Sequence, residues 1–206
     1  RVWRRGQRVS GQAMDTTHYI DMRVRPDEDF PASQLMGALC IRLHRALVAH
    51  GAGDIGVSFP DHSGQRLGNC LRLHGSQQAL AALMAQDWLK GMRDHLDHTP
   101  ATPVPPQAQH RQVTRVQTKS SPERLRRRLV KRLMQRDSLT EAEAAQRIPD
   151  ITARLAALPS VFVRSSSTGQ AFRLFIQHGP LTDQPTAAGT FNAYGLSQGG
   201  ASVPWF

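Results

Sequence analysis

The 206-residue sequence has little of what many common function classes need. Its two cysteines, Cys40 and Cys70, are too few and too isolated for a disulfide framework or a zinc site, so we predict two ordinary buried thiols. No apolar run approaches the ~20 residues that a membrane-spanning helix needs. The N-terminus also lacks the apolar segment of a signal peptide. We therefore expect a cytoplasmic protein without a membrane span.

Familiar catalytic and nucleotide-binding motifs are absent too. There is no Walker loop, no Gly-x-Ser-x-Gly and no His-Glu-x-x-His. The acidic run 27–29 could suggest a metal, but adjacent carboxylates at a strand-to-helix turn more often form a solvated loop and favourable charges at a helix start. We therefore expect no metal and no cofactor. In RNA the 2′-hydroxyl supplies the nucleophile, and a histidine that removes its proton contributes roughly 10²- to 10⁴-fold in rate.

Acidic residues are few beside basic ones, 16 against 26, which gives a net charge of +10. The basic residues are concentrated in segment 121–136, where Ser121 suits an N-cap and Pro122 the first helical position. At about 100° per residue, this helix has leucines on one face and cations on the other. The cationic face consists of Arg124, Arg127, Arg128, Lys131 and Arg132.

Like charges four residues apart cost a few tenths of a kcal/mol each on an isolated helix, so an opposing charge should offset them. A solvated charged face usually interleaves Glu with Lys, and here Glu123 is the only acidic residue. We therefore predict that the helix binds a phosphate backbone. A membrane surface is the weaker alternative, because the apolar stripe is a plain row of leucines suited to docking on a sheet.

The first half of the chain has the pattern of an α+β domain. Its period-2 and helical segments predict strand 18–24, helix 31–49, strands 55–59 and 70–74, helix 76–84 with Ser76 as its N-cap, and a weak strand 92–98. This is the order of a ferredoxin-like (βαββαβ) domain, which we predict for residues 14–98. Residues 1–13 show no period and are predicted to be a disordered extension, with a basic RNA-binding arm as the alternative.

A proline-rich linker, 99–109, is predicted to separate this domain from a second α+β domain at 110–206 that contains the arginine-rich helix. Thr140 and Glu143 have the spacing of a capping box at the start of another helix. Further expected elements are an extended segment 110–118 and strands 161–164, 172–177 and 191–196. The predicted fold class is therefore α+β.

Nine histidines could act as the base, and spacing alone does not choose among them. His44 lies at the border of the apolar stripe of helix 31–49, between Ile41 and Val48. A structural histidine at a helix edge is the alternative interpretation.

Short segments along the chain together form a specific pattern. They are YIDMRVRP (19–26), LHRALV (43–48), IGVSFP (55–60), RVQ (115–117), PERLRRRL (122–129), RSSSTGQ (164–170), FRLFI (172–176), YGLS (194–197) and VPWF (203–206). From Met14 to Phe206, the chain resembles the type I-F CRISPR repeat-processing endoribonucleases, the Csy-type subunits that cleave pre-crRNA.

The resemblance implies a ferredoxin-like N-terminal domain and an arginine-rich helix that enters the major groove of the repeat hairpin. The five cations of that helix would bind phosphates, although Lys131 stands where arginine is expected and lacks its bidentate contact. Arg115 and Gln117 would read base edges at the foot of the stem, since Arg pairs with G and Gln with A. Phe172 would stack on the terminal base pair.

For cleavage, the resemblance implies His44 as general base, Ser165 as the group that holds the sugar and Tyr194 as the group that orients His44. Ser167 and Thr168 would line the same pocket. The expected products are a 2′,3′-cyclic phosphate and a 5′-hydroxyl, formed without a metal. The enzyme, a monomer when free, would stay on the crRNA and join the other subunits of the type I-F surveillance complex. A non-catalytic RNA-binding subunit and a DNA-binding regulator are the alternatives.

Overall fold

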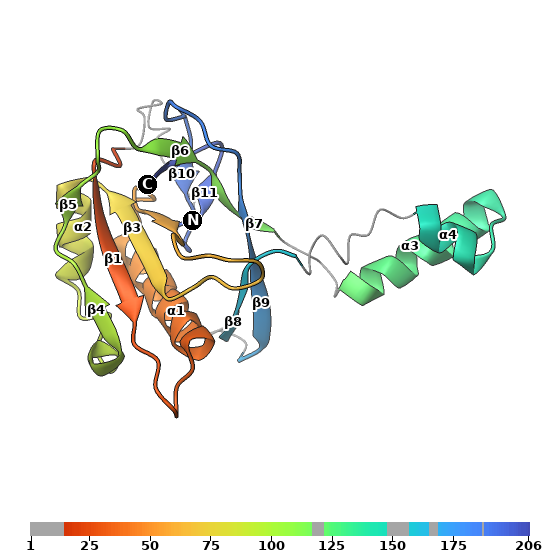
Figure 1. The fold of residues 1–206 in the computed structure, drawn as a ribbon, viewed down its shortest axis with the longest axis horizontal. Helices are drawn as coiled ribbons and strands as arrows, with labels where there is room; N and C mark the ends of the chain where they lie inside the picture. Colours follow the sequence, from red (N-terminus) through yellow and green to blue (C-terminus); the bar gives the residue numbers. More distant parts are fainter. Residues whose placement is uncertain (1–14, 117–121, 148–156, 165–168, 187) are drawn as a thin grey trace, which may run out of the picture.

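A computed structural model describes residues 15–116, 122–147, 157–164, 169–186 and 188–206, and within 122–126 it describes the backbone only. The described chain contains four α-helices and antiparallel sheets, which confirms the α+β class (Figure 1). The extension predicted at 1–13 lies outside the described residues.

The largest sheet is built from the first half of the chain. Its elements in chain order are β1 (His18–Val24), α1 (Ala32–His50), β2 (Gly56–Ser58), β3 (Cys70–Gly75), α2 (Gln77–Met84), the 3-10 helix η1 (Arg93–His95), β4 (Leu96–His98) and β5 (Thr102–Pro103). The strand order is β2-β3-β1-β4, with every pair antiparallel, and β5 pairs with the start of β1. Proline is tolerated at that edge because the ladder there needs no donor from it.

The apolar patterns explain why these elements form. In β1 the alternate residues Ile20, Met22 and Val24 are buried, as expected when one face of a strand contacts the core. In α1 the buried residues recur at helical spacing. The helix stops at Gly51, which has φ 72° and whose backbone N–H donates to the Leu47 carbonyl oxygen with 2.9 Å between nitrogen and oxygen. The predicted Ser76 cap is confirmed, since its hydroxyl accepts from the Ala79 N–H.

The second half of the chain adds three smaller sheets. Its strands are β6 (Gln109–Arg111), β7 (Val113–Val116), β8 (Ser160–Arg164), β9 (Ala171–His178), β10 (Thr190–Phe191), β11 (Ser197–Gln198) and β12 (Val203–Trp205). The order β7-β9-β8 forms an antiparallel sheet, and α1 packs against β8. Gly37 permits this contact, because a Cβ there would overlap the Phe162 carbonyl oxygen. One hydrophobic core includes residues from both halves of the chain.

The arginine-rich helix α3 (Pro122–Asp137) packs on α4 (Glu141–Arg147) instead of on a sheet, so the predicted docking of its leucine stripe is wrong. Leu129, Val130 and Leu133 form a separate small cluster with residues of the α4 segment, which are Leu139, Ala144 and Ala145. Figure 1 shows this helix pair beside the main body. A short turn joins the two helices, so bringing α4 onto the leucine stripe costs little loop entropy.

The capping box before α4 is confirmed. The Thr140 N–H donates to a Glu143 carboxylate oxygen at 2.9 Å, and the Glu143 N–H donates to the Thr140 hydroxyl at 3.4 Å. The strand predicted at 191–196 is wrong, because only Thr190–Phe191 is extended and a tight turn follows. Gly195 has φ 72°, a conformation that breaks a strand.

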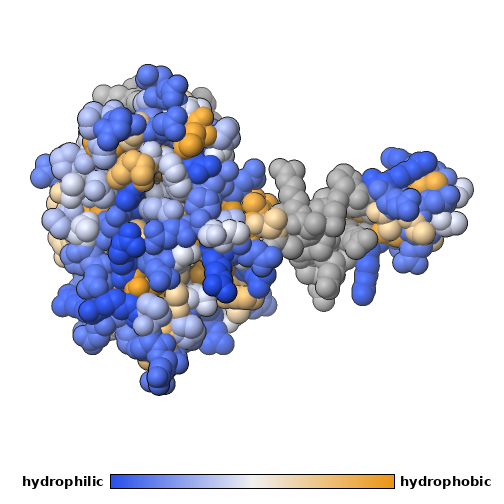
Figure 2. All heavy atoms as spheres, viewed as in Figure 1, coloured by the Kyte–Doolittle hydropathy of each residue, from blue (hydrophilic) through white to orange (hydrophobic). Residues whose placement is uncertain are grey.

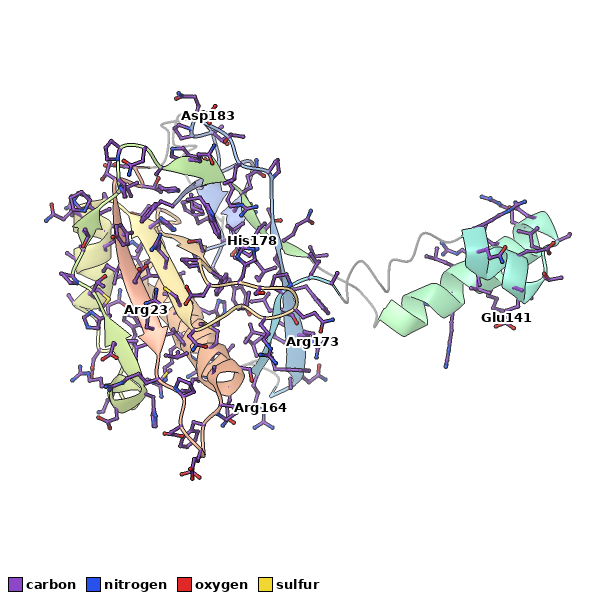
Figure 3. The ribbon with its side chains drawn as sticks, in the orientation of Figure 1. Arg23, Glu141, Arg164, Arg173, His178 and Asp183 are labelled. Carbon is purple, nitrogen blue, oxygen red and sulfur yellow. The ribbon has the colours of Figure 1, made fainter. Side chains whose placement is uncertain are left out.

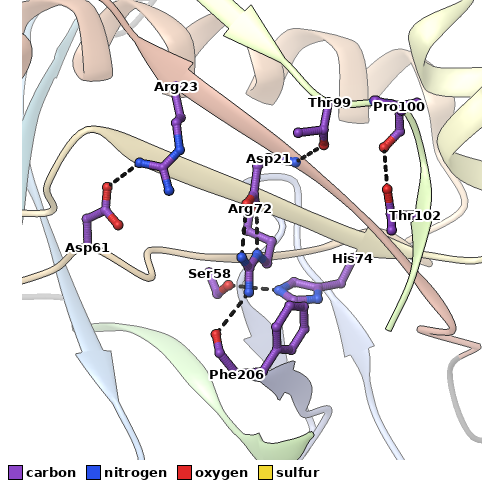
Figure 4. Close-up of polar contacts among 10 residues, drawn as sticks. All are labelled: Asp21, Arg23, Ser58, Asp61, Arg72, His74, Thr99, Pro100, Thr102 and Phe206. Carbon is purple, nitrogen blue, oxygen red and sulfur yellow. Dashed lines mark hydrogen bonds and ion pairs between the residues drawn. The ribbon is translucent and has the colours of Figure 1, made fainter. Parts of the chain in front are cut away.

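An ion pair between the buried Arg72 and the half-buried Asp21 fixes the end of the chain on the large sheet (Figure 4). The Arg72 guanidinium donates to both oxygens of Asp21, at 2.6 and 2.9 Å, and to the Phe206 carbonyl oxygen at 3.1 Å. The same guanidinium lies over the Phe206 ring, with 4.0 Å to the ring centroid. Charged and aromatic contacts therefore position the strand β12 that precedes Phe206.

Cys40 and Cys70 are buried free thiols, as predicted. Burial raises the pKa of each thiol to about 12, so both are protonated and unreactive near neutral pH. In the part of the chain that the structure describes, no helix is long and apolar enough to cross a membrane.

Candidate active site and RNA-binding surface

His44 on α1 is half-buried and is held by the turn that follows β10. Its Nδ1 lies 2.8 Å from the Ala193 carbonyl oxygen, and its ring stacks on Tyr194 with 4.1 Å between centroids and 10° between planes. A carbonyl oxygen only accepts hydrogen bonds, so Nδ1 must donate. In the neutral imidazole this assigns the lone pair to Nε2, which is then able to accept a proton from a substrate.

Arg115 and Phe172 lie next to this pair. The Arg115 guanidinium is 5.6 Å from the Tyr194 ring centroid and 5.3 Å from that of Phe172, within the range of a cation–π contact. Arg115 comes from β7 and Phe172 from the neighbouring strand β9. The fold therefore brings together four side chains that are far apart in the sequence: His44, Arg115, Phe172 and Tyr194.

Other predicted site residues lie outside the described residues. These are Gln117, Ser165, Ser167 and Thr168. Arg124 belongs to α3, but its side chain is not described. The described neighbours show where the chain enters and leaves the serine-rich segment: Arg164 ends β8, and Gly169 precedes β9.

The cationic face of α3 is exposed to solvent. Arg127, Arg128, Lys131 and Arg132 are all exposed, and within the described ranges no salt bridge involves them. Among the described side chains of this helix, the one carboxylate is that of Asp137, and it pairs with other arginines. Figure 2 shows mostly hydrophilic residues on the visible face of this helix pair. The helix therefore presents uncompensated positive charge, as a phosphate-binding surface requires.

Two further histidines, the buried His74 and the half-buried His178, have lowered pKa values, which narrows the choice of a base. Burial, with smaller contributions from Arg72 and His110, holds the pKa of His74 well below its ordinary value. Burial also lowers the pKa of His178 to about 3, helped by nearby His62 and Arg111. His178 stacks on His62 at 3.8 Å and meets the edge of Trp205, and Figure 3 labels it on the β9 side of the main body.

Sequence reasoning missed the Ala193 carbonyl, because a backbone acceptor has no signature in residue type. The nearest signal was the Asn-x-x-Gly pattern at 192–195, which is typical of a turn.

For metals, no group of three or more His, Cys, Asp or Glu side chains among the described residues could hold an ion.

Comparison with known proteins gives the class and then the family. A family model described as CRISPR-associated protein (Cas_Csy4) matches residues 19–206. A protein of Pseudomonas aeruginosa (strain UCBPP-PA14) named CRISPR-associated endonuclease Cas6/Csy4 is 57% identical over 192 residues, which cover 92% of this chain and 99% of the relative. A protein of the same name from Escherichia coli (strain UTI89 / UPEC) is 48% identical over 189 residues, again 92% of this chain and 99% of the relative.

These matches place the chain among the CRISPR-associated endonucleases. The chain belongs to the Csy4 family.

Proposed function

We propose that this chain is the endoribonuclease that matures crRNA in a type I-F CRISPR system. It binds the hairpin of the repeat RNA and cuts pre-crRNA at the 3′ foot of the stem. The observation that supports this most directly is His44, whose Nδ1 donates to the Ala193 carbonyl oxygen at 2.8 Å and whose ring stacks on Tyr194. That arrangement leaves Nε2 as the proton acceptor that a general base needs.

The proposed reaction is a transesterification that needs no metal. His44 Nε2 takes the proton of the 2′-hydroxyl, and the resulting oxygen attacks the adjacent phosphorus. The bond to the 5′ oxygen breaks, and that oxygen leaves as a 5′-hydroxyl after gaining a proton, so that the upstream product ends in a 2′,3′-cyclic phosphate. Ser165 holds the sugar, and Tyr194 orients the imidazole of His44. Ser167 and Thr168 line the same pocket.

RNA recognition uses two surfaces in this proposal. Arg124, Arg127, Arg128, Lys131 and Arg132 contact phosphates of the stem, which the exposure of the four described side chains supports. At the foot of the stem, Arg115 and Gln117 read base edges and Phe172 stacks on the last base pair. The Arg115 guanidinium already lies beside Phe172 and Tyr194, so base reading and cleavage would occur at one place.

The fold and the assembly complete the proposal. The antiparallel order β2-β3-β1-β4 supports a ferredoxin-like domain at 14–98, followed by the linker 99–109 and the hairpin-binding domain 110–206. The protein acts in the cytoplasm, is a monomer when free, remains on the mature crRNA and joins the other subunits of the type I-F surveillance complex.

The test is the His44→Ala variant, compared with His98→Ala as a control at an exposed histidine of β4. With the repeat RNA of the CRISPR array in the same genome, His44→Ala should lower cleavage by roughly 10²- to 10⁴-fold and leave hairpin affinity nearly unchanged. His98→Ala should cleave like the parent protein. Cleavage that survives in His44→Ala would exclude this histidine as the base.

Binding and cleavage assays also distinguish the proposed endoribonuclease from two other functions. A non-catalytic RNA-binding subunit, the alternative suggested by the basic helix alone, would bind the hairpin without cutting it. A DNA-binding regulator would bind duplex DNA as tightly as the RNA hairpin.

A further inference from the structure

The turn at 192–196 is organised by one side chain. Asn192 Oδ1 accepts from the Tyr194 N–H at 2.8 Å and from the Leu196 N–H at 3.2 Å. The backbone of Asn192 also bonds within the turn, donating to the Leu196 carbonyl oxygen at 2.9 Å and accepting from the Gly195 N–H at 2.8 Å. Both groups that hold His44, the Ala193 carbonyl and the Tyr194 ring, belong to this turn.

Backbone hydrogen bonds fix the 192–196 turn to the core. The Gly195 carbonyl oxygen accepts from the Val57 N–H of β2 at 2.8 Å, and the Phe191 N–H donates to the Gly53 carbonyl oxygen at 2.9 Å. A Cβ on Gly195 would overlap the Val57 side chain. The turn therefore cannot slide along β2, and its remaining freedom is the internal conformation that the Asn192 side chain sets.

We propose that Asn192 is a positioning residue for cleavage, acting through Ala193 and Tyr194 to keep His44 in the tautomer with Nδ1 protonated and Nε2 free. This inference rests on the proposed function of His44. Without the Asn192 amide oxygen, the N–H groups of Tyr194 and Leu196 lose their acceptor, and the turn relaxes. The Ala193 carbonyl then moves away from Nδ1, and the imidazole populates the other tautomer, whose Nε2 already has a proton.

The experiment compares Asn192→Ala with Asn192→Ser, whose hydroxyl can accept the same bonds more weakly. The other asparagine of the chain gives the matched control, Asn69→Ala, at an exposed position. Single-turnover cleavage of the repeat RNA, the hairpin Kd and the 15N NMR signals of the imidazole are measured for each. We expect Asn192→Ala to cleave about 10- to 100-fold more slowly with an unchanged Kd, and Asn192→Ser to recover most of the rate.

The NMR signals supply the readout that a purely structural role would not change. In the parent protein the His44 ring should have its proton on Nδ1, and in Asn192→Ala a mixture of tautomers should appear. An unchanged rate, or a loss that Asn192→Ser does not repair, would overturn the role of Asn192. Failure of the proposed function is distinguishable, because His44→Ala would then cleave normally whatever Asn192 does.

A different observation concerns the outer face of the β7-β9-β8 sheet. Phe162 is 62% exposed, more than any other large apolar side chain in the described ranges. Arg173 lies directly opposite it in the β8–β9 register, with its guanidinium 4.6 Å from the ring centroid. Arg164, two residues further on the same face of β8, is also exposed, and Figure 3 labels both arginines on this side of the body.

This face is positively charged and lies opposite to the face of the sheet that carries Arg115 and Phe172, because Phe162 pairs with Arg173 whereas Phe172 pairs with Val163. The three strands contain arginines but no Asp or Glu, so no carboxylate within the sheet competes for them. The Phe162 backbone contacts α1 at Gly37, and His44 follows seven residues later on the same helix, about 10 Å along its axis. Single-stranded nucleic acid binds such surfaces by stacking bases on aromatic rings between cations.

The geometry points to a second RNA contact here, at which a single-stranded nucleotide flanking the hairpin stacks on Phe162 while Arg164 and Arg173 bind its phosphates. This inference also rests on the proposed function. Phe162→Ala and Phe162→Trp are compared on two RNAs, the bare hairpin and the hairpin with its single-stranded flanks. We expect Phe162→Ala to weaken binding of the flanked RNA about 5- to 100-fold and Phe162→Trp to bind it like the parent protein.

The bare hairpin should bind equally to all of these variants. If Phe162→Ala and the parent protein bind the flanked RNA with equal affinity, the proposal is overturned. The exposed Phe162 ring would then be assigned to contact with a protein partner. If the parent protein binds neither RNA, the proposed function itself is wrong, which is a distinct result.

Discussion

Replacing Gly195 by alanine should damage the candidate site through two separate costs. Gly195 has φ 72°, a conformation that costs a residue with a Cβ about 1–2 kcal/mol. The new methyl group would also overlap the Val57 side chain and lie 3.4 Å from the Ile55 carbonyl oxygen, and overpacking of this kind costs about 1–3 kcal/mol. The sum is about 2–5 kcal/mol.

Gly64→Ala is the matched control, because Gly64 has φ 52° and no atom within 4 Å of the added Cβ. It incurs only the backbone cost. At about 2–4 °C per kcal/mol for a chain of this size, thermal melts should show a loss of about 4–20 °C for Gly195→Ala and about 2–8 °C for Gly64→Ala. Cleavage below the melting range should fall only for Gly195→Ala. Equal melting temperatures for the two variants would refute the close packing of the turn on Val57.

The remaining predictions concern charge. If α3 binds phosphates, alanine at both Arg127 and Arg128 should reduce the slope of log affinity against log salt by about 0.7–0.9 per residue, and an unchanged slope would exclude these contacts. Asp21→Ala, which leaves the buried Arg72 without its carboxylate partner, should cost about 3–5 kcal/mol in urea unfolding; a loss below 1 kcal/mol would contradict this. The pKa of His178 is lowered to about 3, so its contribution to stability is complete above pH 6.5 and is lost as pH falls toward 3. His178→Phe should therefore lose less stability than the parent protein between pH 7.5 and 5, and equal losses would refute the shift.

Local sequence patterns predicted most of the regular elements. The alternation in β1 and the helical spacing in α1 are strong signals because one face of each is buried. The Ser76 cap and the Thr140–Glu143 box were predicted because capping needs only residues three positions apart.

Contacts between distant segments could not be predicted from such patterns. The turn at 192–196 was predicted as part of a strand because Phe191 and Tyr194 favour strands, whereas the bonds of Asn192 and the left-handed Gly195 decide the structure. The Arg72–Asp21 pair joins residues 51 positions apart. Neither residue type nor spacing indicates such a pair.

The site was predicted only in part from the residues themselves. Physical reasoning left nine histidines open, and the family resemblance singled out His44. The structure adds the reason this position is suitable, since a backbone carbonyl and a stacked tyrosine fix its ring. The roles of all the site residues, His44 and Tyr194 included, stay predictions.

Attack by the 2′-hydroxyl of the RNA is best tested with the parent protein and two forms of the repeat RNA in excess EDTA. One form is all-ribose, and the other has a single 2′-deoxy sugar before the scissile phosphate. We expect one cut in the first RNA, with a 2′,3′-cyclic phosphate on the upstream product, and binding without cleavage of the second. Cleavage of the deoxy RNA, or cleavage that requires an added divalent cation, would contradict attack by the 2′-hydroxyl with a histidine as base.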